Sequence, residues 1–213
     1  MCLNCSKEIK KENVLLVGSQ SISRHMLLTD AKIPFCIVEQ SADETACDWG
    51  LPLEQVVATI ASSKMEHVVM PVGAESEIAF VLTADTLSQD SSGAIEGKPV
   101  DKDDARRKLR NAQAGSRLVT AFCLERKKCT GGTWLTDARI LKTVSAEYIF
   151  DVPEKWIERY LENSLGLRAS NAIAVEGYGA QFFRVMHGSY STIVGLPMVE
   201  VREALEELGF FSF

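Results

Sequence analysis

Residues 78 to 86 read Ile78-Ala79-Phe80-Val81-Leu82-Thr83-Ala84-Asp85-Thr86, and this stretch decides the fold. A short apolar run with β-branched and aromatic side chains predicts a buried strand. Asp85 stands at the carboxyl end of that run, where ligands bind in open α/β sheets. It is therefore a candidate functional carboxylate, and position alone leaves equally open that it only caps the turn after the strand.

The composition predicts one domain with a sizeable core, in one or two lobes. Of 213 residues, 46% are hydrophobic and 24% are charged, as is ordinary for a globular domain. The net charge of -6 argues against nucleic acid polymers and anionic membranes as partners, so an anionic ligand needs a local cluster of cations. No apolar run approaches the roughly 20 residues of a membrane span. Residues 1–13 lack the apolar core of a signal peptide, so we expect a cytoplasmic protein with an N-terminal extension (1–13) and one domain (14–213).

The six cysteines form no regular framework, and we expect mostly reduced thiols. Cys2 and Cys5 form a C-x-x-C pair, but a zinc site normally needs a second pair or paired histidines. A chemically idle N-terminus is the favoured interpretation. The three histidines are far apart in the sequence, with no metal-ligand spacing.

The apolar stretch 14–17 predicts a strand, and a small polar loop and a helix follow it. This order presents backbone N–H groups to an anion at a helix N-terminus. Ser19, Ser21 and Arg24 could then hold a phosphate. The alternative is that the serines only cap the helix.

A second strand is expected at 35–38, followed by the acidic pair Asp43-Glu44, which suits either a metal or a solvated loop. An amphipathic helix is predicted from Leu53, with Lys64 on its apolar stripe. Such a lysine is usually a dipole partner or a snorkelling side chain, so a ligand role needs further support.

A polar turn is expected at 88–93, and Gly97-Lys98-Pro99 follows it. The glycine allows a close backbone approach and the proline stiffens the exit, so Lys98 would be held in place near Asp85. That arrangement suits a phosphate with a metal, whereas an ordinary glycine-proline turn stays an alternative. A helix is predicted over 101–112, with its charged residues on a solvated face.

The remaining chain alternates predicted strands and helices. Strands are expected at 118–124, 133–140 and 144–150, with a turn at 127–132. A helix opens at Pro153, and another ends the chain with Val201, Ala204, Leu205 and Leu208 on one side. Strands alternating with amphipathic helices are typical of an α/β fold.

Taken together, these stretches resemble the Maf family of nucleoside triphosphate pyrophosphatases, the septum-formation-inhibitor-like proteins. The pieces that carry the resemblance come in family order: Ser19-x-Ser21 with Arg24; Asp43-Glu44; Ile60-Ala61-Ser62-Ser63-Lys64; Ala84-Asp85-Thr86; Gly97-Lys98-Pro99; Gly188-Ser189-Tyr190 with Val194-Gly195-Leu196-Pro197. The resemblance implies an α/β fold with a mixed twisted sheet flanked by helices, in two lobes with the site in the cleft between them. It also implies that a homodimer is an option.

The activity implied by the resemblance is hydrolysis of a nucleoside triphosphate between the α and β phosphates, with a divalent cation such as Mg, Mn or Co. Asp85 matches the catalytic aspartate, as general base or metal-bound carboxylate. Lys64 and Lys98 match the phosphate-holding lysines, and Glu44 matches the acidic loop residue. Thr86 resembles the branch of the family that acts on dTTP and UTP.

The sequence also departs from the family pattern. Ile22 and Ser23 stand where a proline and an arginine are usual, and Arg168-Ala169-Ser170-Asn171 replaces D-K-A-G. Glu176 replaces a glutamine at a substrate-binding position, where a carboxylate could change specificity, add a metal ligand or repel the triphosphate. Two functions stay open: an active pyrophosphatase, which the retained acid and lysines favour, or a catalytically weakened nucleotide-binding or protein-interaction module.

Overall fold

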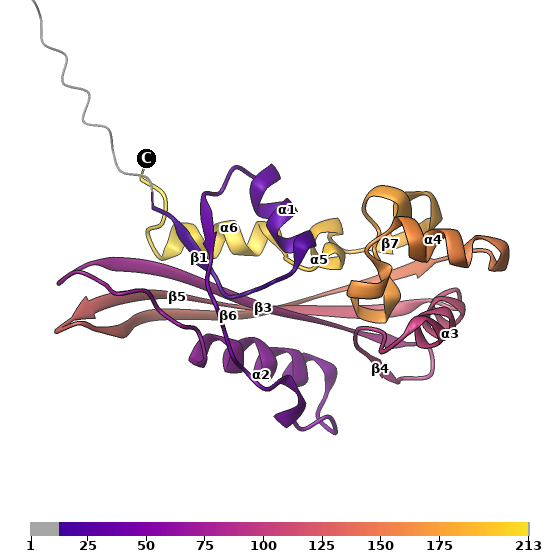
Figure 1. Ribbon diagram of the computed structural model, residues 1–213, viewed down its shortest axis with the longest axis horizontal. Helices are drawn as coiled ribbons and strands as arrows, with labels where there is room; N and C mark the ends of the chain where they lie inside the picture. Colours follow the sequence, from indigo (N-terminus) through magenta and orange to yellow (C-terminus); the bar gives the residue numbers. More distant parts are fainter. Residues whose placement is uncertain (1–12, 213) are drawn as a thin grey trace, which may run out of the picture.

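The computed structural model describes residues 13–212, and its strands form one seven-stranded mixed sheet flanked by helices (Figure 1). The strand order is β2-β1-β3-β5-β6-β7, with β4 paired to β3 at one end. Strand β1 is parallel to β2 and β3, and the other pairs are antiparallel. The strands are β1 Leu15–Val17, β2 Phe35–Ile37, β3 Ile78–Asp90, β4 Ile95–Glu96, β5 Ser116–Thr130, β6 Thr133–Phe150 and β7 Phe183–His187. The predicted α/β fold is confirmed.

Helices cover both faces of the sheet. They are α1 Ile22–Asp30, α2 Leu53–Glu66, α3 Lys102–Ala112, α4 Ile157–Asn163, α5 Tyr190–Val194 and α6 Met198–Glu207, and 3₁₀ turns lie at Glu44–Ala46, Glu154–Trp156, Gly166–Arg168, Ser170–Ala172 and Gly177–Phe182. Figure 1 shows α2 on one face and α1 with α6 on the other. Within residues 13–212, none of the helices has the length and apolar character needed to span a bilayer.

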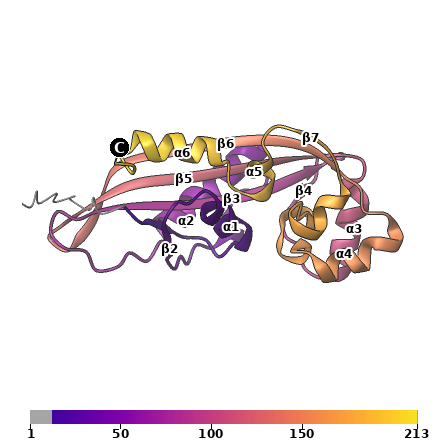
Figure 2. The same cartoon turned by 90° about the horizontal axis from the view of Figure 1, so that it is seen from above.

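The helices gather in two lobes along the length of the sheet, as the prediction expected (Figure 2). In one lobe, α1 and α6 pack on β1, β3 and β5 through Leu28, Phe122 and Leu205, while α2 packs on the opposite face. In the other lobe, α3 and α4 pack on the end of β6 through Leu109 and Tyr160. The two lobes are held by different clusters of buried side chains, and a cleft lies between the lobes.

The structure corrects the prediction that Asp85 ends its strand. β3 continues to Asp90, and Asp85 pairs with Ala121 of β5 in mid-strand. The short parallel strand β1 ends at Val17, which pairs with Leu82. Since β1 and β3 are parallel, Asp85 lies just past the carboxyl end of β1. Strand β3 continues beyond that point because it is still paired with β5.

Three further predictions were wrong at their boundaries. The expected turn at 88–93 begins only after Asp90, and the expected turn at 127–132 is confined to Gly131 and Gly132, both at positive φ. The two strands expected at 133–140 and 144–150 are one continuous strand, β6. The charged face of α3 is not wholly solvated, because Lys108 is buried.

The N-terminal extension predicted for 1–13, with Cys2 and Cys5, lies outside the described residues apart from Asn13. The Asn13 side-chain amide donates to the Phe210 carbonyl at 2.6 Å. Four cysteines lie within the described chain, and all are free thiols, as expected: Cys36, Cys47, Cys123 and Cys129.

Candidate active site

A cleft of about 550 Å³ opens between the two lobes. One wall comes from the loop after β1 and the start of α1, and the other from residues 165–170 and Glu176. All the side chains predicted for the site line this cleft: Ser19, Ser21, Arg24, Glu44, Lys64, Asp85, Thr86, Lys98 and Glu176. Residues from six separate stretches of sequence therefore meet in one place.

At the floor of the cleft, Lys64 joins two carboxylates. Its ammonium lies 2.7 Å from Asp85 Oδ1 and 2.9 Å from Glu44 Oε1. Lys64 and Asp85 are buried, at 6% and 7% exposure, whereas Glu44 is half exposed. The second carboxylate oxygen, Asp85 Oδ2, is buried and has no hydrogen-bond partner among residues 13–212. An unpaired buried carboxylate oxygen is costly, so this atom is available to a bound group.

The charge of Glu44 is governed by the cations around it. Burial acts to raise the pKa of Glu44, but Lys64, Lys98 and Arg24 outweigh it, and the pKa lies below its ordinary value. Glu44 is therefore ionised near neutral pH. Over the whole cleft lining, four cations (Arg24, Lys64, Lys98 and Arg168) face three carboxylates (Glu44, Asp85 and Glu176), an excess of one positive charge.

Arg24 fixes the wall of the cleft. Its guanidinium donates to the Gly195 carbonyl at 2.7 Å, and to Ser19 Oγ and Thr86 Oγ1 at 3.0 Å each. Gly195 has φ 119°, a backbone conformation that favours glycine, whereas a Cβ there would meet Thr86 and Arg24 only at ordinary van der Waals distances. Burial lowers the pKa of Arg24, while the charges of Asp85 and Glu44 act to raise it.

The two serines have structural partners. Ser21 is the N-cap of α1 and accepts from the Arg24 amide at 3.4 Å, and Ser19 Oγ accepts from the Arg24 side chain. Ser21 therefore caps the helix, and because both serines also line the cleft, their role in holding a phosphate stays a prediction. Thr86 Oγ1 lies 2.9 Å from Thr120 Oγ1, which ties β3 to β5 beside Asp85.

Lys98 and Glu176 face the cleft from its two sides. Lys98 is exposed and, within residues 13–212, forms no hydrogen bond or ion pair. Glu176 accepts a hydrogen bond from Ser23 Oγ at 2.5 Å. Two of the departures from the family pattern, Ser23 and Glu176, are therefore hydrogen-bond partners, and their bond links α1 to the opposite wall.

The acidic groups fit a divalent cation for which water and substrate supply most of the ligands. In the described chain, no three His, Cys, Asp or Glu residues gather as a ready metal cage. Mg²⁺ is usually bound through one or two carboxylates together with substrate phosphates. Asp85, with its unpartnered oxygen, and the half-exposed Glu44 supply that donor set.

Sequence reasoning missed Arg168 as a site residue. The segment was noted for the aspartate and lysine that it lacks. The structure nevertheless places Arg168 on the cleft wall, exposed and with no hydrogen bond or ion pair from its side chain to any described residue. A cation one position before the usual lysine was the available signal. Gln40 also lines the cleft and had no signal of its own.

The fold is a two-lobed α/β fold, and its cleft brings four lysines or arginines together with three carboxylates. A family model described as "Maf-like protein" matches residues 14–208. The chain belongs to the Maf family.

Curated relatives agree over nearly the whole chain. The chain is 33% identical to a dTTP/UTP pyrophosphatase of Geotalea uraniireducens over 201 residues, 93% of this chain and 96% of the relative. It is 31% identical to a protein of the same name from Syntrophus aciditrophicus, over 93% of this chain and 92% of the relative. A third, from Anaeromyxobacter dehalogenans, is 32% identical over 92% of this chain and 94% of its own length.

Proposed function

We propose that this Maf family member is a nucleoside triphosphate pyrophosphatase, which hydrolyses its substrate to a nucleoside monophosphate and pyrophosphate with the help of a divalent cation. The observation that carries the proposal is the unpartnered Asp85 Oδ2 at the floor of a cationic cleft. The names of the relatives support dTTP or UTP as the substrate. We further propose that it works in the cytoplasm, with a homodimer as its assembly.

In this mechanism the cations hold the phosphates. The side chains of Lys98 and Arg168 form no hydrogen bond or ion pair with any described residue, so they are free to contact the phosphate oxygens. Lys64 is already paired with Asp85 and Glu44. It therefore stabilises the charges of these two carboxylates, and it can donate to the substrate only while it also donates to them.

Asp85 accepts the proton of the attacking water. Water adds to the α phosphorus, the bond from that phosphorus to the bridging oxygen breaks, and pyrophosphate leaves with the bond electrons. A divalent cation held by Asp85 and Glu44 would neutralise developing negative charge on the phosphates. Buried among apolar strands, Asp85 keeps a fixed orientation, because Lys64 holds its other oxygen at 2.7 Å.

The test is pyrophosphate release from a panel of nucleoside triphosphates, with magnesium, manganese or cobalt and with a chelator as control. We expect release from dTTP and UTP that the chelator abolishes. The Glu176 carboxylate on the cleft wall favours the second candidate, a binding module with little turnover. Nucleotide binding without release from any member of the panel would support that module and overturn the proposed enzyme.

A further inference from the structure

The Lys98 side chain forms no hydrogen bond or ion pair in the described chain. The direction in which it enters the cleft therefore depends on the backbone that carries it. The carbonyl groups of the two residues before it are held from outside the segment. Ser170 Oγ donates to the Glu96 backbone carbonyl at 2.7 Å, and the backbone N–H of Asn171 donates to the Gly97 carbonyl at 2.9 Å. Lys108 Nζ donates to the same Gly97 carbonyl at 3.2 Å.

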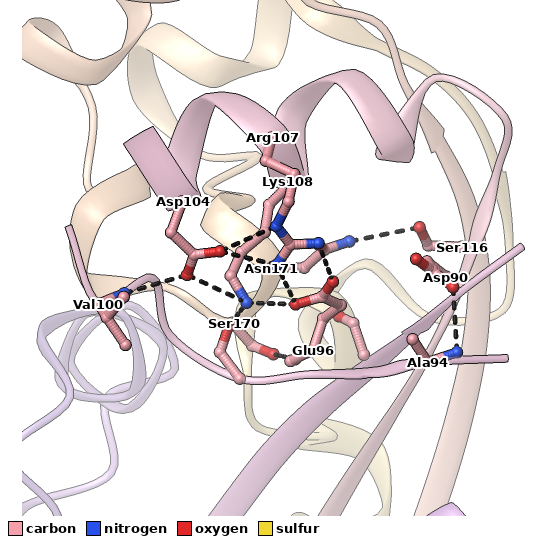
Figure 3. A network of polar contacts seen from close by, with 12 residues as sticks. Asp90, Ala94, Glu96, Val100, Asp104, Arg107, Lys108, Ser116, Ser170 and Asn171 are labelled. Carbon is pink, nitrogen blue, oxygen red and sulfur yellow. Dashed lines mark hydrogen bonds and ion pairs between the residues drawn. The ribbon is translucent and has the colours of Figure 1, made fainter. Parts of the chain in front are cut away.

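The segment is also held after Lys98. Asp104 of α3 accepts from the Val100 amide at 3.1 Å, and Pro99 fixes the backbone between them. Figure 3 shows this arrangement, with Asp104 on Val100 and with Ser170 and Lys108 gathered at Glu96. Lys98 therefore projects from a short segment anchored at both ends.

The anchors are themselves rigid. Lys108 is buried and ion-paired to the Glu96 side chain, which Arg107 also contacts at 2.6 Å. Asn171 is fully buried in the left-handed region, with φ 54°. That conformation is uncommon outside glycine but tolerated by asparagine.

The Asn171 side-chain amide connects this turn to the sheet. It donates to Tyr148 Oη at 3.2 Å and to Ser116 Oγ at 3.3 Å. A continuous path therefore runs from β5 and β6 through Asn171 to the Gly97 carbonyl and Lys98. Ser170 and Asn171 are two of the residues that replace the usual family pattern.

We propose that Ser170 and Asn171 are positioning residues for Lys98: they aim its ammonium at the bound phosphates by fixing the Glu96 and Gly97 carbonyls. This inference rests on the proposed function, in which Lys98 contacts the substrate. Neither side chain needs to touch the nucleotide. The replaced family motif then carries a positional role in this chain.

A double-mutant cycle tests the inference. Ser170→Ala removes the hydroxyl that holds the Glu96 carbonyl, and we expect kcat/KM for pyrophosphate release to fall about fivefold, the size of one neutral hydrogen bond. In a Lys98→Ala background the same change should cost less than about twofold, because residues that act through one group are not additive. Ser170→Thr keeps the hydroxyl and should restore most of the loss.

The matched control is Ser164→Ala. Ser164 lies in the same stretch, but its hydroxyl accepts from the Gly166 amide at 3.1 Å and does not touch residues 96–98. We expect kcat/KM to be unchanged. Equal losses from Ser170→Ala in both backgrounds, no loss in either, or no rescue by threonine would each overturn the inference.

A second readout separates this inference from the proposed function. The cycle is repeated on the dissociation constant of an α,β-methylene nucleoside triphosphate, measured by calorimetry. If the parent releases no pyrophosphate but binds the analogue with the same coupling between Ser170 and Lys98, the proposed reaction is wrong and the positioning role stands. Absence of coupling in binding and turnover alike, or absence of any binding, removes the positioning role.

Discussion

Replacing Lys64 by methionine tests the account of the buried charges at the cleft floor. The methionine keeps most of the apolar stem but removes the ammonium that lies 2.7 Å from Asp85 and 2.9 Å from Glu44. Asp85 is then a buried carboxylate whose second oxygen already lacks a partner. Glu44 is half exposed and can be rehydrated, so the loss arises mainly at Asp85.

Breaking a buried ion pair by removing one partner costs about 3–5 kcal/mol. The lower end applies here, because Arg24 is close enough for Asp85 to influence its pKa and offsets part of the unpaired charge. We therefore expect the free energy of unfolding to fall by about 3 kcal/mol at neutral pH. For a chain of this size that corresponds to a fall in Tm of roughly 6–12 °C.

Urea unfolding followed by circular dichroism measures this change. The matched control is Lys128→Met, since the Lys128 side chain is exposed and forms no ion pair or hydrogen bond with any described residue; the change should alter the free energy of unfolding by less than about 0.5 kcal/mol. The double variant Lys64→Met with Asp85→Asn also removes the unpaired buried carboxylate charge, so it should recover part of the lost free energy of unfolding. The reasoning fails if Lys64→Met is as stable as the control, or if the two changes destabilise additively.

Three further predictions concern the charges around the cleft. Glu176→Gln keeps an acceptor for Ser23 but removes a negative charge from the wall, so KM for the triphosphate should fall by roughly fivefold; an unchanged or higher KM contradicts this. Arg168→Met should raise KM about threefold, with a smaller effect at high salt because the side chain is exposed, and an effect independent of salt would exclude a long-range electrostatic role. The pKa of Glu44 is lowered in the folded state, so its contribution to stability is present above its ordinary value of 4.5 and is lost as pH falls below it. Glu44→Gln should therefore lose less stability than the parent as pH falls below 4.5 in urea unfolding, and equal losses there would contradict the assignment.

Local patterns predicted the elements whose signals are local. The apolar stripe from Leu53 gave a helix that the structure begins at Leu53 and ends at Glu66. Asp101 caps α3 by accepting from the Asp104 amide at 2.8 Å, as its early aspartates indicate. Apolar periodicity and capping act within a few residues, so the sequence alone was sufficient for these helices.

Strand lengths depend on distant partners and were predicted less well. Nothing within Thr86–Asp90 indicates that β3 continues, because the pairing that extends it comes from Ser116–Thr120 of β5. β6 was divided in two because much of its length is partly exposed, which interrupts the apolar alternation. In both cases the tertiary ladder outweighed the local pattern.

The site was predicted through the family resemblance more than through physics. Local reasoning left Lys64 and Lys98 undecided between surface and ligand roles, and only the fold brings them into one cleft. The buried pair of Lys108 with Glu96 was not foreseen, because a charged helix face carries no local sign of which lysine finds a buried partner. The Ser23–Glu176 contact joins residues 153 positions apart and could not be inferred from either stretch alone.

The central claim is that Asp85 performs the chemistry of a nucleoside triphosphate pyrophosphatase. The most direct test is pyrophosphate release from the preferred nucleotide by the parent and by Asp85→Asn, with unfolding measured on both. We expect turnover to fall at least about 100-fold, as for loss of a positioned general base, while the variant stays folded because Lys64 keeps Glu44 as a partner. Undiminished turnover by a folded Asp85→Asn variant would remove Asp85 from the mechanism and contradict the account.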